Sequence, residues 1–351
     1  MSETQTIQEQ IQVAAASGTP LSIQGGGSKA FYGRTPYGGT LSVSGHHGII
    51  DYTPSELVIS ARAGTLLTEL ESVLAQEGQM LAFEPAHFGE RATLGGTIAC
   101  AFSGPRRPYA GAARDFVLGI NCVNGSGEWL RFGGQVMKNV AGYDVSRTLT
   151  GSLGTLAVLL DIHLRVLPRP ETEITLQLGC DAATAIQRCN TLAAKSLPIT
   201  ASCHVDEKLI IRLSGMEQGV KAAAAGIGGE VLEDAEDFWQ QLREQQLAFF
   251  SGERPLWRLS VPPATEALAI EGDTLLDWGG AQRWLRSEQP AGTIRAIADS
   301  VGGHATLFRG GDHSSEVFHP LQAELLALHR RLKKSFDPAG ILNPGRMYRE
   351  L

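Results

Sequence analysis

The chain has 351 residues, of which 43% are hydrophobic and 19% charged, and its formal net charge is −7. This composition is typical of a soluble globular protein, and the length predicts about two domains. The acidic balance argues against broad electrostatic binding of nucleic acid or of an anionic membrane surface. Glycine is unusually frequent, with 41 residues, and this predicts many tight loops.

The cysteines are odd in number and never form a C-x-x-C pair, which is typical of reduced cytosolic thiols. Their spacing also excludes an iron–sulfur cluster motif within the chain. The N-terminus lacks the basic start and the apolar segment of a signal peptide. The longest apolar stretch, LAVLLDIHLRVL, is interrupted by charged residues and is too short to cross a bilayer. We therefore expect a cytoplasmic protein without direct membrane insertion.

The predicted elements alternate between helices and short strands. Ile7 and Ile11 lie on one face of a helix that ends at Gly18, and a second helix runs from Thr65 to Gly78. Short strand-like runs fill the rest of the first 170 residues. The prolines of LPRPET at 167–172 predict a boundary, beyond which helices and strands alternate to about residue 310. A helix over 321–334 and a proline-rich loop close the chain. The pattern is α+β.

Three glycine clusters stand in the first half of the chain: IQGGGSK at 23–29, a stretch over 92–120 and another over 133–159. A glycine triplet after a short strand can point successive N–H groups at a phosphate, although such triplets also occur in plain surface turns. Three clusters in one domain favour a long, two-part cofactor. No G-x-G-x-x-G opens a helix and no P-loop is present, which argues against a Rossmann fold and an ATPase.

The motifs IQGGGSK, TLGGTIACAFSGPRRPYAGAARDFVLGI, KNVAGYD, TGSLGTLAVL and FDPAGILNPGRMY together resemble the vanillyl-alcohol oxidase and p-cresol methylhydroxylase family of FAD proteins. Within that family they are most similar to FAD-binding subunits of bacterial glycolate oxidases. The resemblance implies an α+β fold in which residues 1–170 form a two-subdomain FAD-binding domain. Residues 171–310 would form a smaller α+β cap domain, and residues 311–351 would return to the FAD domain.

The family pattern also implies which residues bind the cofactor. The first glycine loop would wrap the pyrophosphate, and the later motifs would line the rest of FAD. Covalent members carry a histidine just after the first glycines, whereas this chain has Ser28 and Lys29, so the FAD is expected to be non-covalent. The implied cofactor-binding set is Gly25, Gly26, Gly27, Ser28, Pro85, Thr93, Gly95, Gly96, Thr97, Ser103, Gly104, Gly154, Ala157 and Val158. Ala157 stands where the family usually has glycine.

Catalytic 2-hydroxy-acid members of the family carry H-x-G-D-G-N-x-H in the cap. The corresponding stretch here is RGGDHSSE, in which Arg309 and Glu316 replace the two histidines. The remaining candidates for a catalytic role are weak, and no metal site is predicted. They are Asp312, His313, His319 and Arg346.

We therefore expect an FAD-binding subunit that relays electrons or supports assembly. A catalytic FAD subunit and an iron–sulfur subunit would be its partners, and together they would oxidise glycolate, a small 2-hydroxy acid, to glyoxylate. Such a subunit would be cytoplasmic, or peripheral on the inner membrane through the complex. Two alternatives remain open at this point: an independent FAD-dependent 2-hydroxy-acid dehydrogenase and a flavin-free assembly subunit.

Several polar residues have an ordinary interpretation beside a functional one. His46 and His47 fit a solvated turn between strands better than a ligand site. Arg106 and Arg107 fit surface charge, or a contact to a phosphate or a partner's acid.

The last motifs leave the same choice open. Lys138, Tyr143 and Asp144 belong to a motif that the family often places near the flavin, but Asp144 equally fits a helix start. Asn343 and Arg346 could reach the isoalloxazine or could form a rigid proline turn that fixes the C-terminus.

Overall fold

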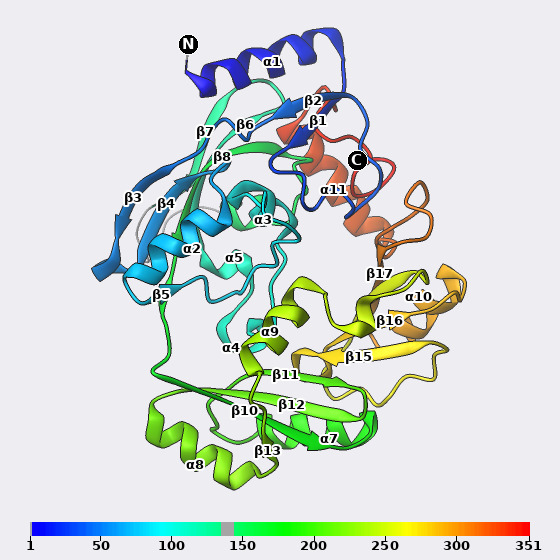
Figure 1. Ribbon diagram of the computed structural model, residues 1–351. Coiled ribbons are helices and arrows are strands. Elements are labelled where there is room, and N and C mark those ends of the chain that lie inside the picture. Colours follow the sequence, from blue (N-terminus) through cyan, green and yellow to red (C-terminus); the bar gives the residue numbers. More distant parts are fainter. Residues whose placement is uncertain (1, 135–143) are drawn as a thin grey trace. The chain divides into compact units, whose positions relative to one another are not determined.

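The computed structural model describes residues 2–134 and 144–351 (Figure 1). The chain divides into two compact units. The first unit takes in Met1–Phe102, Ala112–Pro168 and His313–Leu351, and the second takes in Ser103–Gly111 and Arg169–Asp312. Residues 103–111, which the sequence places in the first domain, thus belong to the second unit. The roles of cofactor domain and cap domain stay predictions. Within the described residues, no helix has the length and apolar character needed to cross a bilayer.

The first unit combines a sheet of five antiparallel strands, in the order β3-β4-β8-β6-β7, with the parallel pair β1-β2 and the short pair β5-β9. Its elements are α1 (Glu3–Ser17), β1 (Leu21–Gln24), β2 (Gly39–Ser42), β3 (Ile49–Thr53), β4 (Val58–Arg62), α2 (Leu67–Gln76), β5 (Gln79–Met80), α3 (Leu94–Cys100), α5 (Ala113–Phe116), β6 (Val117–Asn124), β7 (Trp129–Gly133), α6 (Val145–Leu149), β8 (Ala157–Arg165), β9 (Leu167–Pro168) and α11 (Ala323–Phe336).

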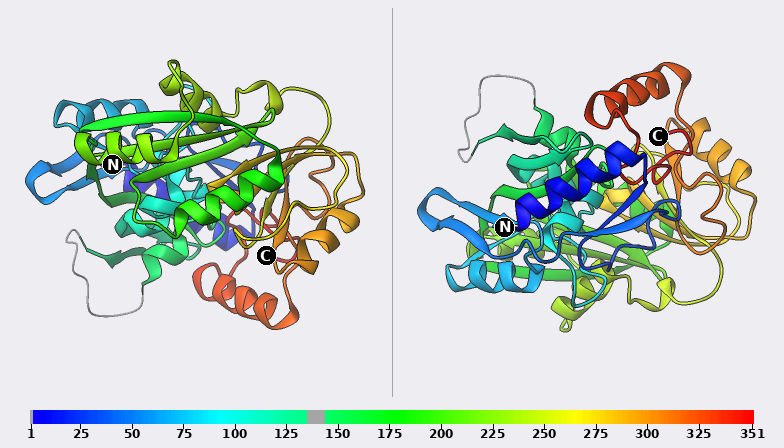
Figure 2. Two further views of the ribbon diagram at one scale, coloured as in Figure 1. Left: turned by 90° about the horizontal axis from the view of Figure 1, so that it is seen from below. Right: turned by 90° about the horizontal axis from the view of Figure 1, so that it is seen from above.

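The second unit is built on a sheet of eight strands in the order β13-β10-β12-β11-β15-β16-β14-β17. Helices α7 and α8 pack against β10, β11 and β12 through one apolar cluster (Figures 1 and 2). The elements are α4 (Arg107–Ala110), β10 (Thr172–Gly179), α7 (Ala182–Ala193), β11 (Ile199–Val205), β12 (Lys208–Gly215), α8 (Glu217–Ile227), β13 (Glu230–Val231), α9 (Ala235–Glu244), β14 (Leu256–Ser260), β15 (Asp273–Asp277), β16 (Gln282–Arg286), α10 (Ala291–Ser300) and β17 (His304–Arg309).

The predicted N-terminal helix is confirmed, and its ends follow from local chemistry. Ser2 begins α1 with a capping box, and Gly18 ends it in the left-handed conformation at φ 65°. Ile7 and Ile11 are buried and belong to one apolar cluster with residues of β1, β2, β6 and β8. Ile341 and Leu342 from the far end of the chain complete the same apolar cluster. The core of the first unit therefore joins both chain ends beside β1.

Arg106 and Arg107 are not simple surface charges. Arg106 is buried and Nη2 donates to Glu173 Oε1 at 2.6 Å within the second unit. Arg107 stacks over the Trp278 ring at 4.3 Å, and Trp278 Nε1 donates to the carbonyl of Gly104 at 3.0 Å. These interactions fix the short segment 103–111 within the second unit, which explains why it belongs there while the residues on either side of it belong to the first unit.

The His46 turn also differs from the sequence interpretation. It does connect two strands, but the His46 ring is buried, with Nε2 2.9 Å from Asp161 Oδ1. Asn121 Nδ2 donates to the other carboxylate oxygen of Asp161 at 2.9 Å. Burial opposes ionisation of Asp161, but these two hydrogen bonds, together with the nearby imidazoles of His46 and His163, lower the pKa of the carboxyl group. His46 and Asp161 are 115 residues apart in the sequence, so sequence spacing alone does not reveal that they pair.

The buried His163 on β8 is expected to make the folded state less stable in acid. Burial lowers the pKa of its ring from the usual 6.5, although Asp161 opposes the shift, and Nδ1 lies 2.7 Å from Ser60 Oγ. The unfolded chain therefore binds this proton at a higher pH than the folded chain, so stability falls as the pH drops below about 6.5. We expect His163→Asn to flatten the pH dependence of the urea midpoint between pH 7 and pH 5. If the urea midpoint of the variant changes with pH as steeply as that of the wild type, this role of His163 is wrong.

Candidate cofactor site

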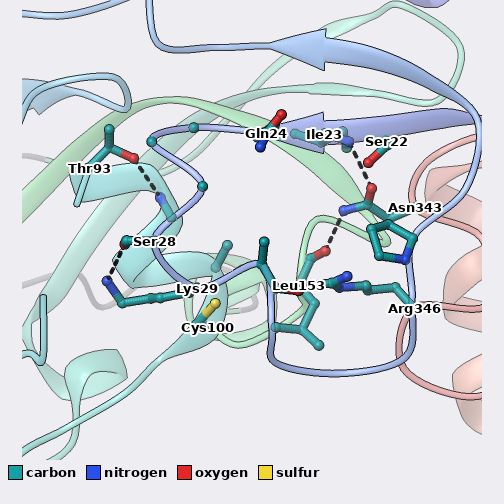
Figure 3. A pocket seen from close by; sticks show the side chains of 17 residues that line it. Ser22, Ile23, Gln24, Ser28, Lys29, Thr93, Cys100, Leu153, Asn343 and Arg346 are labelled. Carbon is teal, nitrogen blue, oxygen red and sulfur yellow. Dashed lines mark hydrogen bonds between the residues drawn. The ribbon is translucent and has the colours of Figure 1, made fainter. Parts of the chain in front are cut away.

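A cavity of about 280 Å³ lies in the first unit, where β1 ends (Figure 3). Three stretches that are far apart in the sequence meet there: the first glycine loop, helix α3 and the C-terminal loop. The lining residues are Ser22, Ile23, Gln24, Gly25, Gly26, Gly27, Ser28, Lys29, Ala30, Pro36, Thr93, Gly96, Ala99, Cys100, Leu153, Asn343 and Arg346.

The glycine loop is bare because its neighbours leave no room for side chains. A Cβ atom on Gly26 would lie 1.4 Å from the backbone oxygen of Arg91, and one on Gly25 would lie 2.4 Å from Thr93 Oγ1. Within the described part of the chain, the N–H groups of residues 25–28 donate to no acceptor. Four adjacent donors without partners at a cavity wall are suited to an anion.

Helix α3 supplies the second wall. Residues Thr93, Gly96, Ala99 and Cys100 line the cavity, and their spacing places them on one helix face. Thr93 begins the helix, with Oγ1 accepting from the N–H of Gly96 at 3.3 Å. Gly95 allows the helix to approach the backbone of Ala63, because a Cβ atom there would lie 2.9 Å from the Ala63 oxygen. The glycine pair therefore serves both the cavity and the packing behind it.

Two cations border the cavity. The buried Lys29 directs Nζ to the backbone oxygen of His87 at 3.2 Å and lies 3.5 Å from Ser28 Oγ. Arg346 is also buried, and its guanidinium donates to the carbonyls of Ala30 and Arg34 at 2.9 Å each. Both positive charges act on Cys100, but burial dominates and raises the pKa of its thiol to about 11. The cavity thus combines positive charge with a neutral thiol, and this favours an anionic ligand.

The C-terminal loop reaches the cavity through Asn343. Its Nδ2 donates to the backbone oxygen of Leu153 at 2.6 Å, and its Oδ1 accepts from the N–H of Ile23 at 2.8 Å (Figure 3). Gly154 takes a left-handed φ of 70°, and a Cβ atom there would lie 2.8 Å from Asn343 Nδ2. A side chain at position 154 would therefore displace the amide that joins the two ends of the unit.

The structure brings together part of the expected cofactor set. Residues 25–28, Thr93 and Gly96 line the cavity, and Gly95 and Thr97 lie on the same helix. Pro85 and the β8 residues Ala157 and Val158 are buried outside it, and Ser103 and Gly104 belong to the second unit. Cys100 was not expected in the lining. Its spacing of four residues from Gly96 on a helix is the signal that could have revealed it.

The weak catalytic candidates do not gather around the cavity, except for Arg346. Asp312 is exposed and belongs to the second unit. His313 Nδ1 lies 2.9 Å from the backbone oxygen of Gly33, and the backbone oxygen of His319 accepts from Tyr348. Within the described residues, no three His, Cys, Asp or Glu side chains are placed to hold a metal ion.

Only part of the third glycine cluster, 133–159, lies within the described residues. Asp144 begins α6, accepting from the N–H of Arg147 at 3.2 Å, so the helix-start interpretation is confirmed. Lys138 and Tyr143 lie outside the described residues.

Comparison with known proteins places the chain in a family. Residues 1–133 match the model of an FAD binding domain, and residues 310–347 match the C-terminal domain of FAD linked oxidases. The chain is 50% identical over 348 residues to the glycolate oxidase subunit GlcE of Escherichia coli (strain K12), covering 99% of this chain and 98% of that protein. The chain belongs to the GlcE family. As a member of the GlcE family, it is a component of an FAD-dependent oxidoreductase.

More distant relatives of the GlcE family chain include the glycolate oxidase subunit GlcD of Bacillus subtilis (strain 168). It is 29% identical over 202 residues, covering 56% of this chain and 43% of that protein. Among solved structures, p-cresol methylhydroxylase with substrate bound superposes with a TM-score of 0.72 at 15% identity, covering 99% of this chain and 87% of that one. Alkyldihydroxyacetonephosphate synthase gives 0.66 at 16% identity, covering 97% and 75%. The expected α+β fold of the p-cresol methylhydroxylase type is confirmed.

Proposed function

We propose that this chain holds FAD non-covalently in the cavity at the end of β1. It would serve as the FAD-binding subunit of a complex that oxidises glycolate to glyoxylate. The observation that carries the proposal is the set of unpartnered N–H groups at residues 25–28 beside two buried cations. The match of this region to an FAD binding domain supports the same ligand.

The residues present fit the cofactor's charge. The N–H groups of the glycine loop would donate hydrogen bonds to the pyrophosphate oxygens, and Lys29 and Arg346 would balance their negative charge. Burial of a cation costs free energy unless an anion compensates it, and a diphosphate supplies that compensation. Thr93 and Gly96 would form the wall beside the loop.

The nucleophiles of the described lining support non-covalent attachment. Among the described residues that line the cavity there is no histidine, and Cys100 is the one thiol. Burial holds the pKa of that thiol at about 11, so it is protonated at neutral pH and is a poor nucleophile. We therefore expect the flavin to be released when the protein is denatured.

Bound FAD would supply a two-electron acceptor, but removing the hydroxyl proton of a 2-hydroxy acid also needs a general base near the flavin ring. In the stretch RGGDHSSE, Arg309 and Glu316 stand where catalytic members of the family carry histidines. We therefore expect the subunit to receive electrons or to support assembly rather than to oxidise the substrate itself.

The proposed assembly contains a catalytic flavoprotein subunit similar to GlcD and an iron–sulfur subunit. The carboxylic acid substrate would be oxidised on the first of these. This chain would remain in the cytoplasm, or peripheral on the inner membrane through the complex. The names of its relatives motivate the assembly, since GlcE and GlcD are both glycolate oxidase subunits.

Anaerobic stopped-flow absorbance tests this proposal. The isolated chain and the reconstituted complex are each mixed with glycolate, and the oxidised-flavin band is followed. We expect the isolated chain to keep its oxidised spectrum, whereas all the flavin in the complex is reduced. Reduction of the isolated chain at a catalytic rate would instead make it an independent 2-hydroxy-acid dehydrogenase.

A further inference from the structure

The buried Lys333 near the end of α11 has a partner for each of its three N–H donors. Its Nζ donates at 2.7 Å to the backbone oxygen of Thr155, to Asp337 Oδ2 and to the backbone oxygen of Leu342. An ammonium has three donors and no acceptor, so every proton has a partner. Its side chain is only 10% exposed and that of Asp337 is fully buried.

Asp337 extends this network into the following loop. Its Oδ1 accepts from the N–H of Ile341 at 3.1 Å, and Oδ2 also accepts from the N–H of Leu342 at 2.8 Å. Lys333 therefore binds a backbone oxygen of the loop after α11, and the Asp337 carboxylate binds two of the loop's N–H groups. This loop ends at Asn343, which lines the cavity.

The same loop is fixed to β1, the strand that leads into the glycine loop. Leu21 N–H donates to the Ile341 oxygen at 2.7 Å, and Asn343 N–H donates back to the Leu21 oxygen at 2.9 Å. The Asn343 side chain then joins Ile23 to Leu153, as described above. The C-terminal loop thus bridges β1 and the turn before β8, and Lys333 connects that turn to the loop through Thr155.

We propose that residues 337–346 act as a clasp on the cofactor cavity, and that Lys333 is the positioning residue that keeps the clasp closed. Lys333 does not line the cavity, so it would act through Leu342 and Asn343. This inference rests on the proposed function, because the ligand it concerns is FAD. Binding and closure are then coupled, and the coupling must be reciprocal: a clasp that favours FAD is itself stabilised by FAD.

Hydrogen exchange on the wild-type chain tests the coupling without any substitution. We expect saturating FAD to slow exchange at the amides of Ile341, Leu342 and Asn343 by at least about tenfold. This matches a coupling of about 1.4 kcal/mol. The amides of Leu209 and Ile211 in the second unit serve as a reference and should change little. Equal exchange with and without FAD at the clasp amides would overturn the inference.

Lys333→Met tests the positioning role, with Lys221→Met as the matched control. Lys221 on α8 also pairs with a carboxylate four residues away, that of Glu217, but both side chains are exposed and lie in the second unit. We expect Lys333→Met to raise the Kd for FAD about tenfold or more and to remove the FAD-dependent protection of the clasp amides. Lys221→Met should leave both unchanged. A role confined to general stability would lower the urea midpoint without moving the Kd.

The outcomes separate the two proposals. A wild-type chain that takes up no FAD would overturn the proposed function itself. A wild-type chain that binds FAD, together with a Lys333→Met variant of equal affinity and equal protection, would overturn the clasp alone. If Lys333→Met does not fold, the wild-type exchange experiment still decides the coupling.

Discussion

Gly26→Ala is expected to eliminate stoichiometric FAD from the purified chain while leaving it folded. The added Cβ would lie 1.4 Å from the Arg91 backbone oxygen, which no side-chain rotation relieves, so the glycine loop must move. Arg91 is exposed, and the displacement can be absorbed locally. Because the four N–H donors are then displaced from the cavity wall, we expect the Kd for FAD to rise at least about a hundredfold, or ~2.7 kcal/mol. Flavin absorbance after desalting and a fluorescence titration measure it.

Gly226→Ala is the matched control for this prediction. Gly226 lies inside α8, and a Cβ atom there would meet nothing within 4 Å. Alanine is favoured over glycine in a helix by up to about 1 kcal/mol, so this variant should be as stable as the wild type or more so, with normal flavin content. Normal flavin in Gly26→Ala would contradict the assignment of the cradle.

Lys29→Met is expected to produce the second large effect on the cofactor. The substitution removes a buried positive charge at the cavity wall and leaves the His87 carbonyl without this donor. A hydrogen bond to a charged group is worth about 1.5–3 kcal/mol, so the Kd for FAD should rise on the order of ten- to a hundredfold. Isothermal titration of the apoprotein with FAD measures it.

Lys195→Met provides the comparison, because Lys195 is exposed in the second unit. It changes the net charge of the chain by the same amount. If both lysine variants weaken FAD binding equally, the weakening comes from the net charge of the chain. The local role of Lys29 would then be wrong.

Much of the fold was predictable because local signals and tertiary packing agree. The spacing of Ile7 and Ile11 and the stop at Gly18 predict α1, and the apolar run after Gly154 predicts the buried strand β8. The resemblance of the glycine motifs to FAD proteins anticipates the cavity at residues 25–28. In these places the periodicity, the capping residue and the final environment all favour the same structure.

The remaining features depend on contacts across long sequence distances. Arg106 looks like surface charge until Glu173 pairs with it, and His46 looks solvated until Asp161 is placed beside it. The hydrogen bonds of Lys333 could not be predicted from the sequence either, since one acceptor, the Thr155 oxygen, is 178 residues away. A single sequence gives the propensity of each segment but not its partners. Buried polar networks are therefore the part that sequence reasoning misses.

The most direct test of the account is the flavin content of the purified chain before and after acid precipitation. We predict one FAD per chain in the native protein and its full recovery in the supernatant, because the described residues that line the cavity offer anion-binding donors and, as their one thiol, the protonated Cys100. A colourless chain that takes up no added FAD would contradict the assignment of the cavity. Flavin that stays with the precipitate would contradict non-covalent binding.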